Sequence, residues 1–192
     1  QLLKFKRVVA ELRDELSGNP ALDGFKTHAL NSSGVMRFPQ HGMDYVRMGL
    51  SLFGATLSEI EVGLKPAVSF KTVITQVQNI PAGEGVGYGF DSPTDKHRVI
   101  AWLPVGYADG YPRSLSNGKG VVSIGGRLAK VAGRICMCLT AVDVTGMTVS
   151  AGDEVELFGD TMRIENVARA ADTIPYELLA RVHQRVIRRI IN

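Results

Sequence analysis

Apolar residues recur at helical spacing through the first 18 residues of the chain. Positions three and four apart lie on one face of a helix, so this spacing predicts an amphipathic helix. Ser17-Gly-Asn-Pro20 is a run of turn-forming residues and is expected to end it. The apolar positions are Leu3, Phe5, Val8, Val9, Leu12 and Leu16.

Two short apolar stretches follow, at 24–30 and 45–50, and each predicts a strand. A helix or loop is expected between them, near 38–44. In this order the elements are typical of the end of an α/β barrel of the TIM type, and residues 1–64 are assigned to it.

The pattern changes from about Lys65 onward to short runs rich in Val and Ile, separated by turn residues such as Asn117-Gly118. Short helices are expected at 164–171 and near Tyr176. Residues 65–192 are therefore predicted to form a β-rich domain, so that the fold class is α/β plus β.

Composition supports a folded core, because 45% of the 192 residues are hydrophobic. The net charge is +3, and the cations are scattered except for four arginines at 181, 185, 188 and 189. These arginines alternate with Val and Ile, which indicates a solvated face beside a core strand or helix; nucleic-acid binding is the alternative. Without aromatic residues placed for base stacking, no nucleic-acid partner is expected.

Cys136 and Cys138 are the two cysteines, and they lie two positions apart. Neighbouring positions on the same face of a strand rarely form a disulfide, so both thiols are expected to be free and the compartment reducing, as in the cytoplasm. No run of about 18 apolar residues occurs, so no membrane contact is predicted for this segment.

Two tyrosines lie in glycine-rich turns, Tyr88 in Gly85-Val-Gly-Tyr-Gly89 and Tyr107 in Gly106-Tyr-Ala-Asp-Gly110. A phenol with backbone close on both sides suits acid/base chemistry on a small substrate. The alternative is an ordinary hairpin, because Gly-Tyr and Asp-Gly pairs also mark such turns.

Polar turns that follow the two predicted strands suggest a phosphate site. Thr27-His-Ala-Leu-Asn-Ser-Ser33 ends in hydroxyl and amide groups, and Asp44-Tyr-Val-Arg-Met-Gly-Leu-Ser51 combines a strand, a buried cation and a glycine. Barrel enzymes bind phosphate at the carboxyl ends of their last strands. Ser32, Gly49 and the Leu50 amide fit that site.

Six motifs in this order resemble the alanine racemases of fold type III, which depend on pyridoxal phosphate (PLP). Members of that family are about twice as long, and their first barrel half carries the lysine that binds PLP. The resemblance implies a C-terminal half that is inactive without an N-terminal half. The motifs are His28-Ala-Leu-Asn-Ser32, Arg47-Met-Gly-Leu50, Val86-Gly-Tyr-Gly89, Gly106-Tyr-Ala-Asp-Gly110 with Arg113, Gly133-Arg-Ile-Cys-Met137 and Thr173-Ile-Pro-Tyr-Glu177.

The resemblance implies a two-base proton transfer, with the lysine on one face of the substrate and Tyr88 on the other. A free phenol has a pKa of about 10, so a cationic neighbourhood must stabilise the phenolate. His28 and Arg47 are the candidates, and Arg47 would also contact the pyridine nitrogen of PLP. His28 has an alternative reading as a core histidine bonded to a neighbouring strand, whereas a buried Arg47 without a role would be costly.

The remaining site residues follow from the same resemblance. Asn31, Ser32, Gly49, Leu50 and Tyr176 would bind the cofactor, although Ser32 could equally cap a turn and Tyr176 could start a helix. The substrate-binding residues would be Tyr107, Arg113, Arg134, Met137 and Cys138. No metal ligand set is expected.

Cys138 departs from the family, which typically has an acidic residue after Met137. A thiol removes a charge and opens space at the pocket wall, so serine racemisation, broad specificity and loss of activity stay open beside alanine racemisation. The resemblance further implies a homodimer with shared active sites that supplies D-amino acids for the cell wall. A non-catalytic β-rich assembly module is the alternative from another class.

Overall fold

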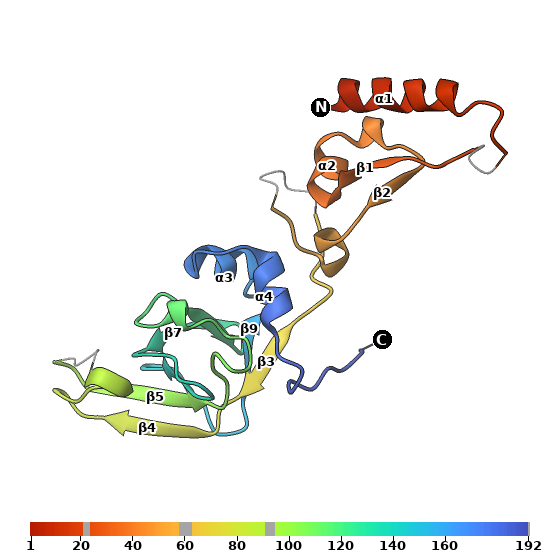
Figure 1. Ribbon diagram of the computed structural model, residues 1–192. Coiled ribbons are helices and arrows are strands. Elements are labelled where there is room, and N and C mark those ends of the chain that lie inside the picture. The colour runs from red at the N-terminus through yellow and green to blue at the C-terminus, as the bar shows by residue number, and fades with distance from the viewer. Residues whose placement is uncertain (21–23, 58–62, 91–94, 192) are drawn as a thin grey trace. The chain divides into compact units, whose positions relative to one another are not determined.

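The computed structural model describes residues 1–192 apart from 21–23, 58–62, 91–94 and 192. Its described part divides into two compact units, Gln1–Gly49 and a second made of Leu50–Leu57 and the chain from Gly63 onward. The helices are α1 (Leu2–Glu15), α2 (Ser32–Arg37), α3 (Ile164–Ala170) and α4 (Pro175–Arg181) (Figure 1). The strands are β1 (His28–Asn31), β2 (Tyr45–Arg47), β3 (Phe70–Val73), β4 (Gln76–Ile80), β5 (Arg98–Leu103), β6 (Val121–Ile124), β7 (Arg127–Ala132), β8 (Thr140–Asp143) and β9 (Glu154–Phe158).

The first unit contains α1, which confirms the predicted N-terminal helix, and a parallel pair of strands, β1 and β2. Both strands are shorter than the predicted stretches. Helix α2 follows β1 directly and was missed, because a helix of six residues is too short to show a periodic pattern. Between α2 and β2 the chain forms a short 3₁₀ helix at Pro39–His41, where a helix or loop was expected.

Asn31 starts α2, since its side chain accepts a hydrogen bond from the Gly34 backbone N–H at 2.9 Å. This side chain satisfies one of the free N–H groups of the first helical turn. The cap of this turn is therefore Asn31, and Ser32 is the first helical residue.

The second unit is built on one antiparallel sheet of seven strands, in the order β3-β9-β6-β7-β8-β5-β4. Only two residues join β3 to β4, although these strands form opposite edges of the sheet. Such a link spans about 11 Å, whereas the edges of a flat seven-stranded sheet would lie about 29 Å apart. The sheet must therefore curl until its edges approach each other, which confirms the β-rich domain and gives it a half-barrel form.

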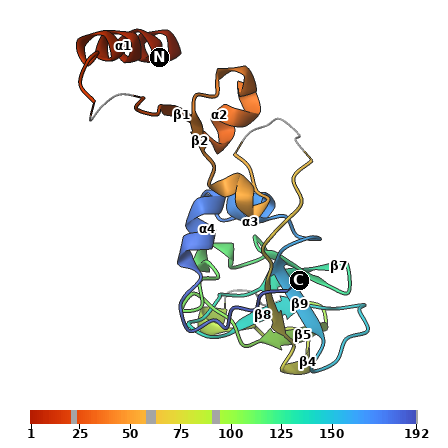
Figure 2. The ribbon, with the colours of Figure 1, turned by 90° about the vertical axis from the view of Figure 1, so that its right-hand side faces the viewer.

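Helices α3 and α4 contact each other and lie together on one side of this sheet, as both ribbon views show (Figures 1 and 2). The predicted helices at 164–171 and near Tyr176 are thus confirmed. Leu157 of β9, Val167 of α3 and Leu178 of α4 belong to one buried apolar cluster. The sheet and the two helices therefore share a core.

The segment Leu50–Leu57 packs with the second unit, ahead of the boundary that the sequence placed after residue 64. Arg163 donates hydrogen bonds to the carbonyls of Gly54 (2.7 Å) and Leu64 (3.3 Å). The Glu165 carboxylate accepts one from the Thr56 backbone N–H at 3.0 Å. These contacts attach the segment to α3, and the predicted domain division itself stays a prediction.

The expectation of a core strand or helix beside the C-terminal arginines is only half right. Helix α4 ends at Arg181, and after it Val182 and Val186 pack against the core. Ile187 and Ile190, by contrast, are 80% and 96% exposed. Because the backbone leaves helical geometry at Val182 (ψ 109°), the apolar residues no longer share a face. Across the described residues, no helix has the length and apolar character to cross a membrane.

Candidate functional site

The first part of the candidate site lies where the parallel strands β1 and β2 end. Ser32 follows β1 and is 3% exposed, and its Oγ accepts a hydrogen bond from the Gly49 backbone N–H at 2.9 Å. The carboxyl ends of adjacent parallel strands meet at one sheet edge, which brings these two residues together. Two of the predicted phosphate ligands therefore converge, whereas the Asn31 side-chain oxygen is occupied as the cap of α2.

His28 and Arg47 also come together on these strands. His28 Nδ1 lies 3.1 Å from Arg47 Nη1. The register of the strands pairs His28 with Tyr45 and Arg47 with Asn31. Arg47 is exposed, so the prediction of a buried cation is wrong for the described chain. The reason is that β1 and β2 form a sheet of only two strands, whose faces receive little cover.

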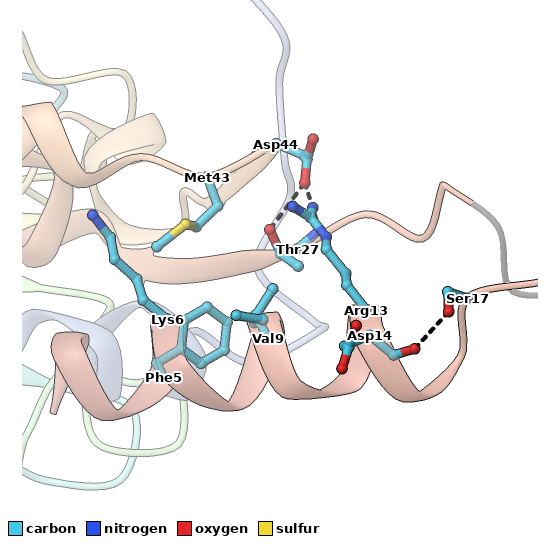
Figure 3. Close-up of a pocket in the computed structure, with 10 residues that line it drawn as sticks. Phe5, Lys6, Val9, Arg13, Asp14, Ser17, Thr27, Met43 and Asp44 are labelled. Carbon is cyan, nitrogen blue, oxygen red and sulfur yellow. Dashed lines mark hydrogen bonds between the residues drawn. The ribbon is translucent and has the colours of Figure 1, made fainter.

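A polar cluster at the start of β1 was missed in the sequence. The Asp44 carboxylate accepts hydrogen bonds from the Thr27 backbone N–H (2.8 Å) and hydroxyl (2.9 Å), and Lys26 lies 3.7 Å away. The Arg13 side chain extends toward the same carboxylate (Figure 3). The Thr27 hydrogen bonds lower the pKa of Asp44, and the Lys26 and Arg13 cations lower it further.

Figure 3 shows the groove between α1 and this cluster. Phe5, Val9 and Met43 line its apolar part, and Asp44 and Lys6 line its polar part. None of the predicted site residues lines this groove. This groove is therefore separate from the predicted site residues of the first unit.

The second part of the candidate site is a cleft of about 730 Å³ in the second unit. Its walls come from three chain segments that are far apart in sequence, at 87–88, 102–113 and 134–139. Six predicted catalytic or substrate-binding residues line it, namely Tyr88, Tyr107, Arg113, Arg134, Met137 and Cys138. The structure therefore gathers residues that the sequence could only propose one by one.

The walls of this cleft approach each other at the backbone level. The N–H groups of Tyr107 and Ala108 donate to the carbonyls of Cys136 (3.1 Å) and Met137 (2.9 Å). A Cβ on Gly106 would lie 2.2 Å from the Cys136 oxygen. No side chain fits there, so glycine is required for the two segments to meet.

Gly133 has the same function on the Tyr88 side of the cleft. Its φ of +66° suits glycine, and a Cβ would lie 2.2 Å from the Val86 carbonyl oxygen. This close approach places the Gly85–Gly89 turn against the segment that carries Arg134. Tyr88 follows in a short 3₁₀ turn and is 74% exposed.

The two cysteines lie in the non-strand segment between β7 and β8 and are free, so the expected strand placement is wrong while the free thiols are confirmed. Cys138 Sγ accepts a hydrogen bond from Arg185 Nη2 at 3.2 Å. Arg185 also pairs with Asp109, which is 9% exposed. Sequence reasoning missed this pair; the one available signal was the aspartate inside Gly106-Tyr-Ala-Asp-Gly110.

Leu50 and Tyr176 belong to the second unit. Leu50 is 2% exposed and lies in the main core cluster, so only its backbone is available to a ligand. Tyr176 occupies the first turn of α4 after Pro175, and its side chain is 40% exposed. Its place at the start of a helix agrees with the alternative reading, and its role toward a cofactor stays a prediction.

The predicted partnership between Tyr88 and the His28–Arg47 pair stays a prediction, because these residues lie in different units and each unit is described by itself. Within the described residues, no group of three or more His, Cys, Asp or Glu side chains is placed to bind a metal ion.

Comparison with known proteins gives the same picture for residues 67–190, which match the family model "Alanine racemase, C-terminal domain". An alanine racemase from Halothermothrix orenii is 42% identical over 86% of this chain and 45% of its own length. The biosynthetic alanine racemase of Pseudomonas aeruginosa is 40% identical over 88% of the chain and 48% of its own. The chain thus spans about half the length of the curated relatives it matches.

Solved structures show the same similarity. The crystal structure of the Pseudomonas aeruginosa biosynthetic enzyme matches 94% of this chain and 51% of its own, with a TM-score of 0.81 and 37% identity. An alanine racemase from Bartonella henselae with covalently bound pyridoxal phosphate matches 96% of this chain and 49% of its own. Its TM-score is 0.83 at 33% identity.

Proposed function

This chain belongs to the alanine racemase family, and we propose that it supplies the C-terminal part of an enzyme that interconverts L- and D-alanine. The carrying observation is the cleft of the second unit, which collects six predicted site residues, four of them tyrosines and arginines suited to proton transfer and to attraction of a carboxylate. Two phenols, two guanidinium groups and a backbone segment at Met137 face one space. A cleft lined mainly by apolar atoms with a few polar groups is the usual form of a small-molecule site.

We propose further that the first unit is the end of a TIM-type α/β barrel. The order β1, α2, β2, with the two strands parallel, is the repeat from which such barrels are built. A sheet of two strands needs neighbours, so an N-terminal half would supply the other strands together with the lysine that binds the cofactor.

Racemisation removes the α-proton of an amino acid on one face and returns a proton on the other. Tyr88 is the proposed acid/base on one face, since its phenol lies exposed at the cleft wall. The lysine of the N-terminal half would serve the other face. Arg113 and Arg134 would line the path of the substrate to this cleft, where their positive charge attracts its carboxylate.

PLP is the proposed cofactor, and when bound it withdraws electrons from the α-carbon and so acidifies the α-proton. The residues at the strand ends fit this group. The Gly49 N–H donates to Ser32 Oγ at 2.9 Å, so a hydroxyl and a backbone N–H lie together at the strand ends, and a bound phosphate would replace Ser32 as the acceptor of that N–H. Arg47, which lies 3.1 Å from His28, would face the pyridine nitrogen of PLP. Because a guanidinium does not readily give up its proton, the pyridine nitrogen would stay unprotonated.

The proposed assembly is a homodimer with shared active sites. Tyr88 and Met137 would complete a site whose cofactor is bound by the other subunit, through His28, Arg47, Ser32 and Tyr176. A two-fold dimer then contains two equal sites. A cytoplasmic location and a role in supplying D-alanine for the cell wall complete the proposal.

One observation favours a second substrate class. Cys138, and not an acidic residue, stands at the cleft wall beside Met137. A neutral thiol there leaves more room and less negative charge for a substrate side chain, so serine or a larger amino acid is the second candidate. Parallel assays with alanine and serine, on the unmodified protein and on Cys138→Asp, separate the two candidates.

The proposal is tested with Tyr88→Phe in the protein that combines this chain with an N-terminal half. Phenylalanine keeps the ring and deletes the ionisable oxygen, so the fold should change little. We expect α-hydrogen exchange in deuterated water to fall at least about a hundredfold for one alanine enantiomer and far less for its mirror image. Exchange is followed by proton NMR of each enantiomer.

Tyr45→Phe is the matched control, because Tyr45 is exposed on β2 and belongs to none of the proposed roles. It should leave the exchange of both enantiomers unchanged. Small and equal effects of Tyr88→Phe on both enantiomers would make Tyr88 a structural residue. Absence of exchange in the unmodified protein with PLP bound would favour the non-catalytic assembly module.

A further inference from the structure

Two chain segments, the Gly106–Asp109 turn and the C-terminal segment with His183 and Arg185, meet at Asp109 in the second unit. Asp109 Oδ2 accepts a hydrogen bond from the Gly106 backbone N–H at 2.9 Å, which closes its own turn. Asp109 Oδ1 accepts from Arg185 Nε at 2.8 Å and lies 2.7 Å from Arg185 Nη2. The Asp109 backbone carbonyl accepts from the His183 N–H at 3.1 Å. The C-terminal segment is thereby fastened to the tyrosine turn.

Arg185 reaches the opposite wall of the cleft with the same side chain. Its Nη2 donates to Cys138 Sγ at 3.2 Å, on the segment that carries Met137. One planar guanidinium therefore contacts both the turn that carries Tyr107 and the segment that carries Met137. Lysine could not make the same contacts, because its single ammonium lacks the fixed fork of donors.

The Asp109 carboxylate of this ion pair is largely shielded from water. The Asp109 side chain is 12% exposed and the Arg185 side chain 45% exposed. A buried carboxylate that loses its cation keeps its desolvation cost without compensation, so the turn would have to rearrange. Arg185 itself does not line the cleft.

We infer that Arg185, through Asp109 and Cys138, is the positioning residue that sets the distance between the Tyr107 and Met137 walls of the cleft. This inference rests on the proposed function for its catalytic consequence. Its structural part stands on the two backbone hydrogen bonds that join these walls, from Tyr107 N–H and Ala108 N–H. Arg185 acts on the substrate through these walls, without contact to the reacting atoms.

The structural part is tested by amide hydrogen exchange in the 192-residue chain joined to its N-terminal half. In Arg185→Gln, the Tyr107 and Ala108 amides should exchange about tenfold faster or more, as expected from the loss of a charged hydrogen bond. The Val142 amide in the core strand β8 should keep its rate. Arg188→Gln is the matched control, because Arg188 lies three residues on and donates to the Val182 carbonyl.

Unchanged exchange at Tyr107 and Ala108 in Arg185→Gln would overturn the inference, whatever the activity. So would an equal acceleration in Arg188→Gln. These readouts need no substrate, so an unmodified protein without racemase activity would count against the proposed function alone.

The catalytic part is tested by kinetics. Arg185→Gln should raise KM for alanine about tenfold, with a smaller fall in kcat, because misplaced walls weaken substrate positioning. Arg185→Lys should recover part of the loss, since the cation opposite Asp109 returns. Arg185→Gln combined with Asp109→Asn should reduce kcat/KM no further than Arg185→Gln alone. Fully additive losses would show that the two residues do not act as a pair.

Discussion

The two compact units differ in the kind of residue that each of them buries. In the described part of Gln1–Gly49, the buried residues are the polar Thr27 and Ser32, and α1 buries none. The second unit buries a large apolar cluster that joins its sheet to α3 and α4. Apolar burial supplies most of the free energy of folding, so the two units must depend on different interactions.

This difference indicates how the functional groups are positioned. In the second unit, the cleft rests on glycine contacts and on a core of its own, so packing brings its walls together before Arg185 links them. In the first unit, hydrogen bonds at the strand ends bring Ser32 to Gly49 and His28 to Arg47. Such polar contacts are stronger where apolar neighbours exclude water. An N-terminal half, as proposed above, would provide that cover.

The largest expected effect comes from truncating a leucine in each unit. Leu157→Ala in β9 removes a fully buried side chain (0% exposed) and should lower the free energy of unfolding by about 2–5 kcal/mol. Leu3→Ala in α1, where the leucine is 84% exposed, should change it by less than about 0.5 kcal/mol. Urea unfolding followed by circular dichroism measures both values.

Equal losses in the two variants would contradict the comparison. Addition of the N-terminal half gives a sharper version of the test. If that half covers α1, Leu3→Ala should become more costly in the combined protein, while the cost of Leu157→Ala should stay the same.

A smaller effect is expected from adding one methyl group to a glycine in each unit. Gly106→Ala places a Cβ 2.2 Å from the Cys136 carbonyl oxygen and should destabilise the second unit by about 1–3 kcal/mol. In Gly49→Ala, the new Cβ has no atom within 4 Å, and the backbone N–H that donates to Ser32 Oγ is kept. It serves as the control, with a change below about 0.5 kcal/mol in the same urea experiment. A cleft that tolerates Gly106→Ala would show that its walls move apart freely.

The smallest effect depends on pH and concerns the first unit. The pKa of Asp44 is lowered in the folded chain, so the ionised carboxylate stabilises the fold. This stabilisation is fully present above the ordinary pKa of about 3.9 and is lost as the pH falls through the lowered pKa. The Thr27 amide should therefore exchange faster, relative to its intrinsic rate, once the pH falls below the lowered pKa of Asp44.

Thr27→Val sharpens this prediction, because it deletes the hydroxyl bond to Asp44 and keeps the backbone bond. The pKa of Asp44, measured by NMR titration, should rise part of the way to its ordinary value. Ser17→Ala removes a hydroxyl that bonds to the Asp14 carbonyl and should leave that pKa unchanged. An identical pKa in Thr27→Val would assign the shift to the backbone hydrogen bond of residue 27 and to the cations Lys26 and Arg13, without a contribution from the hydroxyl.

Sequence patterns predicted those elements well whose formation depends on residues close together in the chain. Helix α1 follows from apolar spacing, and α4 begins at Pro175, a residue suited to the first turn of a helix. Helix α2 was missed because its six residues depend on the Asn31 cap more than on periodicity. The tail after Arg181 was predicted as core because its composition alternates, although the backbone turns away from the helix there.

The candidate site divides in the same way. Tyr88 and Tyr107 were recognisable from their glycine neighbours, since a turn is encoded within a few residues. Arg47 was expected to be buried, which the sequence could not decide, because burial depends on which strands lie beside it. Asp109 and Arg185 are 76 residues apart, and neither position shows in its own motif that it has a partner.

The sequence by itself determined the residue types, the turns and the family to which this chain belongs, because each of these depends on neighbours along the chain. The tertiary structure alone decided that six of the site residues line one cleft, that two glycines permit its walls to meet and that Arg185 joins them. The curl of a seven-stranded sheet brings distant segments within hydrogen-bond reach. Such long-range pairings result from packing the whole chain, and no local pattern specifies them.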